Sequence, residues 1–198
     1  LAEETGLILP IGTWVLETAC KKLREWEKLS TMRHLVLAVN VSAKQFHQPD
    51  FVDLVRRILD KTGINPRRLK LELTESVVIN DMADAVEKMK TLKNMGLAFS
   101  MDDFGTGYSS LLYLRHLPLD QLKIDRSFIS EIESNAGDAA IVQTIIGMAR
   151  SLGLHVIAEG VEKESQHQFL RLNQCPEYQG FLFGQPVPAA VFEHMFKA

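Results

Sequence analysis

Short apolar runs alternate with amphipathic stretches along nearly the whole of this 198-residue chain. Three of the amphipathic stretches stop at a glycine that is followed closely by a new apolar run, at Gly63, Gly96 and Gly153. Glycine ends helices because it adopts the left-handed conformation at little steric cost. The pattern therefore indicates helices joined to strands, and regular alternation of the two predicts a parallel sheet. Continuously apolar runs fit strands that are covered on both faces.

The spacing of apolar residues sets the expected elements. Strands are predicted at 35–41, 69–74, 97–101, 121–124, 155–158 and 178–183. Helices are predicted from Pro10 to Trp26, from Pro49 to the stop at Gly63, and at 81–95, 138–152, 163–172 and 189–197. Apolar and aromatic residues at helical spacing, Trp14 and Ile141 among them, are expected in the core.

Six strands are about two fewer than a closed (β/α)₈ barrel needs, because such barrels typically take around 250 residues. The sheet is therefore either an open doubly wound one or a barrel without its first strands. No linker or low-complexity tract interrupts residues 1–198, which favours one domain.

Composition excludes several classes of function. The formal net charge of −3 leaves no broad basic face for duplex nucleic acid. Cys20 and Cys175 match no redox or metal-ligand spacing and are expected to be buried free thiols, which favours the cytoplasm. No apolar run is long enough to span a bilayer and no secretory signal is present. The chain opens at Leu1 in a polar stretch, so we expect it to be part of a longer polypeptide that could carry a membrane anchor elsewhere.

Polar side chains occur at or near the ends of the first five predicted strands, where ligands bind in parallel α/β folds, and Gln179 lies at the start of the sixth. Because polar residues otherwise avoid buried strands, their recurrence predicts a common site. They are, in chain order, Asn40, Glu72, Glu75, Asp102, Asp103, Lys123, Asp125, Glu159 and Gln179.

Carboxylate and amide oxygens favour Mg²⁺ or Mn²⁺, whereas softer metals prefer cysteine or histidine. Adjacent carboxylates at Asp102 and Asp103 are able to share two cations, as two-metal phosphodiester hydrolysis requires. The ammonium of Lys123 is then placed to orient a water or to neutralise charge on phosphate.

Each residue also has a simpler interpretation. Asn40 alone is a plausible strand-end cap, and Asp102 and Asp103 could cap a helix. For Glu75 we favour a hydrogen bond to the Gly105–Gly107 loop over direct metal ligation. The tripeptide Asp103-Phe-Gly also occurs in protein kinases, but the other kinase motifs are absent from the sequence.

Seven segments together resemble the EAL domain family, bacterial phosphodiesterases that hydrolyse cyclic di-GMP. The resemblance spans nearly the whole chain, and the stretch from Asp102 to Leu111 is its most specific part. The segments are Leu1-Ala-Glu-Glu-Thr-Gly-Leu-Ile, Asn40-Val-Ser-Ala-Lys-Gln-Phe, Glu72-Leu-Thr-Glu, Asp102-Asp-Phe-Gly-Thr-Gly-Tyr-Ser-Ser-Leu, Lys123-Ile-Asp-Arg-Ser-Phe, Ala158-Glu-Gly-Val-Glu and Gln179-Gly-Phe-Leu-Phe.

The resemblance implies a modified TIM barrel with one strand reversed, and two Mg²⁺ or Mn²⁺ ions. It implies that Asn40, Glu72 and Asp102 bind the first metal and that Asp102 and Asp103 bridge to the second. Three more roles follow from it. Glu159 completes the metal and water site, Lys123 positions the attacking water beside Gln179, and Asp125 lies close to substrate and metal. Glu75 would hold the Asp102–Leu111 loop.

The Glu-Ala-Leu triplet that names the family does not occur in this sequence. By resemblance it lies on an upstream strand, and its glutamate is a ligand of the first metal. The expected function is hydrolysis of cyclic di-GMP to linear pGpG. The alternative is a receptor that binds cyclic di-GMP without cleaving it. EAL domains often form homodimers and often follow a sensor or a GGDEF cyclase domain, so such partners are expected as well.

Overall fold

All three glycine joints predicted from the sequence are present in the computed structural model, which describes residues 1–79, 81–105 and 114–196. Gly63, Gly96 and Gly153 each adopt a positive φ at the point where a helix gives way to an extended segment. Contacts between residues divide the chain into two units, Leu1–Phe99 with Val187–Ala198, and Ser100–Pro186. The second unit is thus inserted in the sequence of the first.

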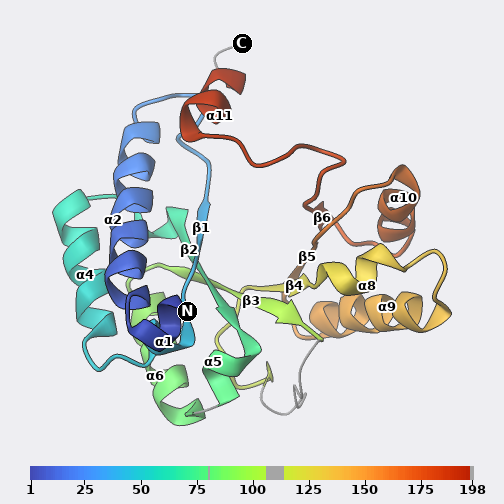
Figure 1. Cartoon of the computed structure of the whole chain (residues 1–198), viewed down its shortest axis with the longest axis horizontal. Helices are drawn as coiled ribbons and strands as arrows, with labels where there is room; N and C mark the ends of the chain where they lie inside the picture. Colours follow the sequence, from blue (N-terminus) through green and yellow to red (C-terminus); the bar gives the residue numbers. More distant parts are fainter. Residues whose placement is uncertain (80, 106–113, 197–198) are drawn as a thin grey trace. The chain divides into compact units, whose positions relative to one another are not determined.

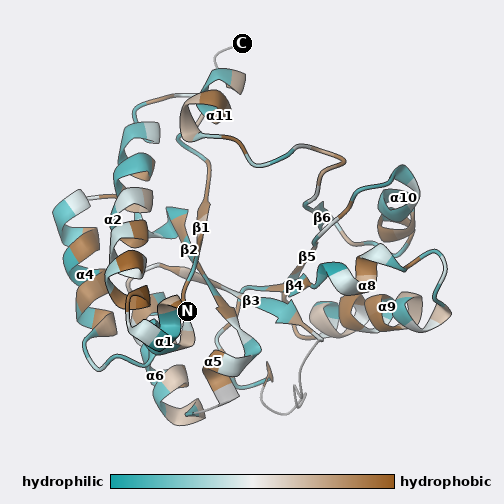
Figure 2. Ribbon diagram, in the orientation of Figure 1, coloured by the Kyte–Doolittle hydropathy of each residue, from teal (hydrophilic) through white to brown (hydrophobic). Residues whose placement is uncertain are grey.

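The first unit is built on two parallel strands (Figure 1). Leu37 of β1 lies opposite Leu69 of β2, and the register runs on to Asn40 opposite Glu72. The apolar side of α4 packs against α2 (Figure 2). The elements are α1 (Ala2–Thr5), α2 (Ile8–Trp26), β1 (Leu37–Asn40), α3 (Ala43–Phe46), α4 (Phe51–Thr62), the 3₁₀ turn η1 (Pro66–Arg68), β2 (Leu69–Thr74), α5 (Glu75–Ile79), α6 (Met82–Asn94) and α11 (Ala189–Met195).

The C-terminal helix α11 returns to the first long helix within this unit. The ring of Phe192 lies 5.6 Å from that of Trp26. The Trp26 indole N–H donates to Glu193 over 2.9 Å, and Lys22 forms an ion pair with the same carboxylate at 3.0 Å. Apolar packing and a polar anchor therefore fix α11 to the end of α2.

The second unit is a parallel sheet with helices between its strands. β3 pairs with β4, β4 with β5 and β5 with β6, each in parallel. Buried Leu122, Ile124 and Ala158 form its centre. Its elements are β3 (Ala98–Phe104, whose first two residues belong to the first unit), β4 (Gln121–Ile124), α8 (Arg126–Ser130), α9 (Ala136–Ser151), β5 (His155–Ala158), α10 (Glu164–Leu172) and β6 (Glu177–Tyr178).

Three sequence predictions about the fold are wrong. Instead of a strand over 178–183, β6 ends at Tyr178 and the chain turns, with the Phe183 N–H bonding to the Gly180 carbonyl. Trp14 is 65% exposed, and Ile141 also faces solvent. β3 continues to Phe104 rather than ending at 101, so it includes Asp102 and Asp103.

The two cysteines are buried and free, as predicted. Burial raises the pKa of each thiol to about 11, with a nearby carboxylate adding to the effect at Cys20. Both therefore remain neutral thiols at physiological pH. None of the helices in the described part of the chain has the length and apolar character needed to cross a membrane.

Candidate active site

In the first unit, Asn40 and Glu72 lie side by side at the carboxyl end of the paired strands. Asn40 is the last residue of β1 and stands opposite Glu72 of β2 in the strand register. The Val41 N–H donates to the Glu72 carbonyl over 3.0 Å, so the chain leaving β1 stays attached to β2. Buried Glu75 begins α5. The structure thus brings together two of the predicted metal ligands, Asn40 and Glu72.

A buried lysine of α6 holds the segment that follows Asn40. Lys88 of α6 donates from Nζ to the carbonyls of Phe46 and Gln48, both over 3.1 Å, and pairs with Asp84 at 2.8 Å. Because a lysine is rarely buried without such partners, Lys88 fixes helix α3 and the chain that follows β1.

In the second unit, Lys123 lies between two carboxylates. Its Nζ is 2.9 Å from Asp102 Oδ1 on β3 and 2.6 Å from Glu159 Oε1, just after β5. The Lys123 side chain is only 7% exposed, whereas its partners are 13% and 20% exposed. Three of the predicted site residues, from three consecutive strand ends, therefore meet at one ion cluster.

Asp103 and Asp125 form a second pair of carboxyl groups in the same unit. Partial burial raises the pKa of Asp103, and the charges of Asp102 and Asp125 add to this effect. Burial opposes ionisation of Asp125 as well, but hydrogen bonds from the Ser127 hydroxyl and N–H and from Asp103 outweigh it and hold its pKa below the usual value. The hydrogen bond between the two carboxyl groups therefore raises the pKa of Asp103 and lowers that of Asp125.

Local backbone geometry turns two successive carboxylates in different directions. The β3–β4 register shifts between Met101 and Phe104, and Asp103 has a φ of 53°. A residue in this left-handed region interrupts the alternation of a regular strand. Asp102 pairs with Lys123, and Asp103, at this irregular position, bonds to Asp125. Residues 106–113 lie outside the described part of the chain, and with them most of the loop that Glu75 was expected to hold.

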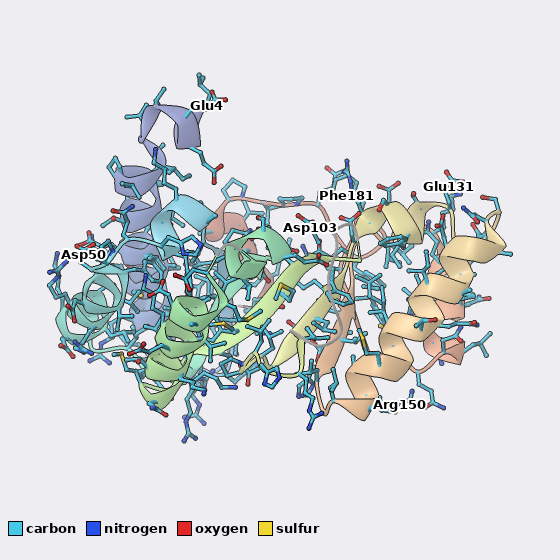
Figure 3. All side chains as sticks on the ribbon, turned by 90° about the horizontal axis from the view of Figure 1, so that it is seen from below. Glu4, Asp50, Asp103, Glu131, Arg150 and Phe181 are labelled. Carbon is cyan, nitrogen blue, oxygen red and sulfur yellow. The ribbon has the colours of Figure 1, made fainter. Side chains whose placement is uncertain are left out.

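Gln179 follows the last strand directly and is attached by its backbone to the Glu159 segment. Its N–H donates to the Ala158 carbonyl over 2.8 Å, and its carbonyl accepts from the Val161 N–H over 3.1 Å. Two residues further on, Phe181 is 59% exposed. Figure 3 shows Phe181 and Asp103 at one edge of this unit and Arg150 at the other.

The chemistry of these side chains favours hard cations. Asp102 and Glu159 pair with the Lys123 ammonium, and Asp103, the residue after Asp102, bonds to the carboxyl group of Asp125. Within the described residues, however, no three histidine, cysteine, aspartate or glutamate side chains are arranged to hold a metal ion. The donor set suits Mg²⁺ or Mn²⁺ in type.

A family model described as the EAL domain matches residues 1–186. The chain belongs to the EAL domain family. Two relatives from Pseudomonas aeruginosa agree with this assignment. MucR, a bifunctional diguanylate cyclase/cyclic di-GMP phosphodiesterase, is 48% identical over 96% of this chain and 27% of its own length. NbdA, a cyclic di-GMP phosphodiesterase, is 44% identical over all of this chain and 25% of its own length. This EAL chain thus spans about a quarter of each relative.

Solved EAL structures confirm the predicted fold class. The MucR phosphodiesterase in complex with c-di-GMP matches with a TM-score of 0.93 at 47% identity, covering 97% of this chain and 77% of that one. The EAL domain of Mycobacterium smegmatis DcpA matches with a TM-score of 0.88 at 40% identity, covering 94% and 83%. The α/β fold predicted from the sequence is therefore the EAL type of barrel fold.

Proposed function

We propose that this EAL domain hydrolyses cyclic di-GMP to linear pGpG. The observation that carries the proposal is the placement of Lys123 between Asp102 and Glu159, in a chain 48% identical to a protein named as a cyclic di-GMP phosphodiesterase. Water adds to one phosphodiester bond of the ring and a ribose oxygen leaves, so a cyclic dinucleotide becomes a linear one.

The proposed metal ligands are Asn40, Glu72, Asp102, Asp103 and Glu159, for two Mg²⁺ or Mn²⁺ ions. When bound, such ions lower the pKa of water and neutralise the charge on the phosphate oxygens. The chain's own groups then orient the reactants. The Lys123 ammonium, held by two carboxylates, directs its charge toward the phosphate and the attacking water. Asp125, kept ionised by Ser127, and Gln179 lie on the loops that flank this cluster.

Hydrolysis is tested by incubating the domain with cyclic di-GMP and Mn²⁺ or Mg²⁺ and separating the products by liquid chromatography. We expect pGpG from the domain and none from Lys123→Ala or Asp102→Asn. The sequence lacks the Glu-Ala-Leu glutamate, so we expect the 198 residues alone to turn over slowly. The assay is therefore repeated with the chain preceded by the upstream segment of its own gene. Absence of pGpG from both forms under either metal would refute the proposal.

A second candidate is a receptor that binds cyclic di-GMP without cleaving it. It is favoured by the lack of the Glu-Ala-Leu glutamate, which the family resemblance makes a ligand of the first metal, in the sequence. Calorimetry with cyclic di-GMP, combined with the product assay, separates the two candidates. A receptor binds cyclic di-GMP tightly, and the chain with its upstream segment then yields no pGpG.

We further propose that the domain acts as a homodimer and as one module of a longer signalling protein. Light scattering of that protein tests the dimer.

A further inference from the structure

The loop that carries Glu159 is held on both sides by backbone contacts within the second unit. On one side, Gly160 approaches helix α8 so closely that an added Cβ would lie 2.5 Å from the Cβ of Arg126. On the other, a Cβ on Gly180 would lie 2.1 Å from the carbonyl oxygen of Val161. The loop therefore has little room to move sideways.

One buried side chain joins this loop to its surroundings. Gln166 of α10 is only 2% exposed. Its carboxamide oxygen accepts from the N–H groups of Glu162 and Lys163, over 2.8 and 2.9 Å. Its carboxamide nitrogen donates to the Ile129 carbonyl at the end of α8, over 3.1 Å. A single carboxamide thus ties together α10, the loop after β5 and helix α8.

The two segments joined by Gln166 carry the reacting groups of the proposed site. The loop after β5 begins at Glu159, which pairs with Lys123 at 2.6 Å. Helix α8 is capped by Asp125, two residues after Lys123. If the loop shifted relative to α8, the distance between the Glu159 carboxylate and the Lys123 ammonium would change with it.

We propose that Gln166 is a positioning residue that sets Glu159 against Lys123 through its bonds to Glu162, Lys163 and Ile129. We call the three hydrogen bonds of the Gln166 side chain, to Glu162, Lys163 and Ile129, the Gln166 clasp. The expected effect on rate rests on the proposed hydrolytic function, but the clasp itself is a property of the fold. Groups that only support catalytic ligands typically change activity about 10- to 100-fold when removed, and misplacement acts on the reacting geometry more than on binding.

Gln168 offers a matched control, because it is a glutamine of the same helix with an exposed side chain. Gln166→Met removes both halves of the clasp at similar volume. Gln166→Glu keeps an acceptor for the Glu162 and Lys163 N–H groups but loses the donor to Ile129. We expect kcat to fall about 10- to 100-fold in Gln166→Met with KM within about twofold, a smaller loss in Gln166→Glu, and no change in Gln168→Met.

Amide hydrogen exchange and NMR test the clasp without turnover. Exchange at Glu162 and Lys163 should accelerate in Gln166→Met but not in Gln166→Glu. The Glu159 side-chain carboxyl ¹³C resonance should shift in Gln166→Met and shift less in Gln166→Glu. If the wild type produces no pGpG, the proposed function fails and these two signals still decide the inference. A Gln166→Met protein that leaves both signals as they are in Gln168→Met overturns it. If Gln166→Met does not fold, Gln166→Glu decides: retained exchange protection at Glu162 and Lys163 supports the clasp, and loss of it overturns the inference.

Discussion

Lys123 Nζ lies 2.6 Å from Glu159 Oε1, so an ammonium at the end of β4 neutralises a carboxylate just after β5. The same nitrogen is 2.9 Å from Asp102 Oδ1 on β3. Three neighbouring strands are therefore linked by one nearly buried cation. Removal of that cation would leave the Asp102 and Glu159 carboxylates largely shielded from solvent and without their shared counter-ion.

Replacing Lys123 with methionine should lower the free energy of unfolding by about 2–3 kcal/mol, somewhat less than for a fully buried pair. Urea denaturation at neutral pH, with a chelator present, measures this loss. Lys163→Met is the control, because Lys163 is 63% exposed and pairs with Glu133 only at the surface; its effect should be below about 1 kcal/mol. Equal effects of the two substitutions would contradict the role given to Lys123.

Replacing Asp103 with asparagine should stabilise the metal-free domain and abolish hydrolysis. The pKa of Asp103 is raised in the folded state, first by burial and then by neighbouring carboxylates. The folded protein thus holds this proton more tightly than the unfolded chain does, and ionisation at higher pH weakens folding. Asparagine keeps a donor for Asp125 and tolerates a positive φ. We expect the melting temperature to rise by about 2 °C at pH 8.

The gain in melting temperature from Asp103→Asn should shrink as the pH falls toward about 4, the ordinary carboxyl range. At that pH the wild-type carboxyl group is neutral, as the asparagine side chain is at every pH. Scanning calorimetry from pH 8 downward measures the difference. Asp60→Asn, at an exposed site on α4, should show no such trend. A gain that stays constant with pH would argue against the Asp103–Asp125 hydrogen bond.

Replacing Gly180 with alanine should displace the Glu159 segment. The added Cβ would lie 2.1 Å from the Val161 carbonyl oxygen and 2.3 Å from its nitrogen, so the backbone must shift. We expect a loss of about 1–3 kcal/mol of stability together with reduced pGpG formation. Gly184→Ala provides the comparison, because a Cβ there meets no atom within 4 Å. Chemical denaturation and the product assay check both variants.

Replacing Lys88 with methionine should loosen the segment after Asn40. The carbonyls of Phe46 and Gln48 would lose their charged donor, and Asp84 would lose its ion-pair partner. We expect the free energy of unfolding to fall by about 2–3 kcal/mol, because buried polar groups that lose their partner are not compensated for their loss of hydration. Lys90→Met, two residues along the same helix and exposed, should change stability by about 0.5 kcal/mol or less. Similar melting curves for the two would contradict this support.

The sequence predicts the elements best where an apolar run has a clear boundary. The strands at 69–74, 121–124 and 155–158 have the predicted bounds. Helix α8 cannot be predicted from periodicity, because its five residues are too few to show a helical repeat. The predicted strand at 178–183 failed for a tertiary reason, since Gly180 packs directly on Val161.

Site residues could be predicted to the extent that a polar side chain interrupts an apolar strand. That rule found Asn40, Glu72, Asp102, Lys123 and Glu159, and within each unit the structure brings its own members together. The rule could not assign different partners to Asp102 and Asp103, because the irregular register of β3 and the positive φ of Asp103 are not visible in the sequence. Gln166 could not be found this way, because its partners are backbone groups distant in sequence or in neighbouring loops.

The contact between Trp26 and the C-terminal helix has a consequence for biosynthesis. Trp26 packs against Phe192 and bonds to Glu193, which are synthesised only after the whole inserted unit. The inserted unit, Ser100–Pro186, has all of its residues available earlier. Since domains tend to fold as units while synthesis proceeds, the inserted unit is able to fold first, and the contacts of Trp26 with Phe192 and Glu193 form only after residue 193 has been translated.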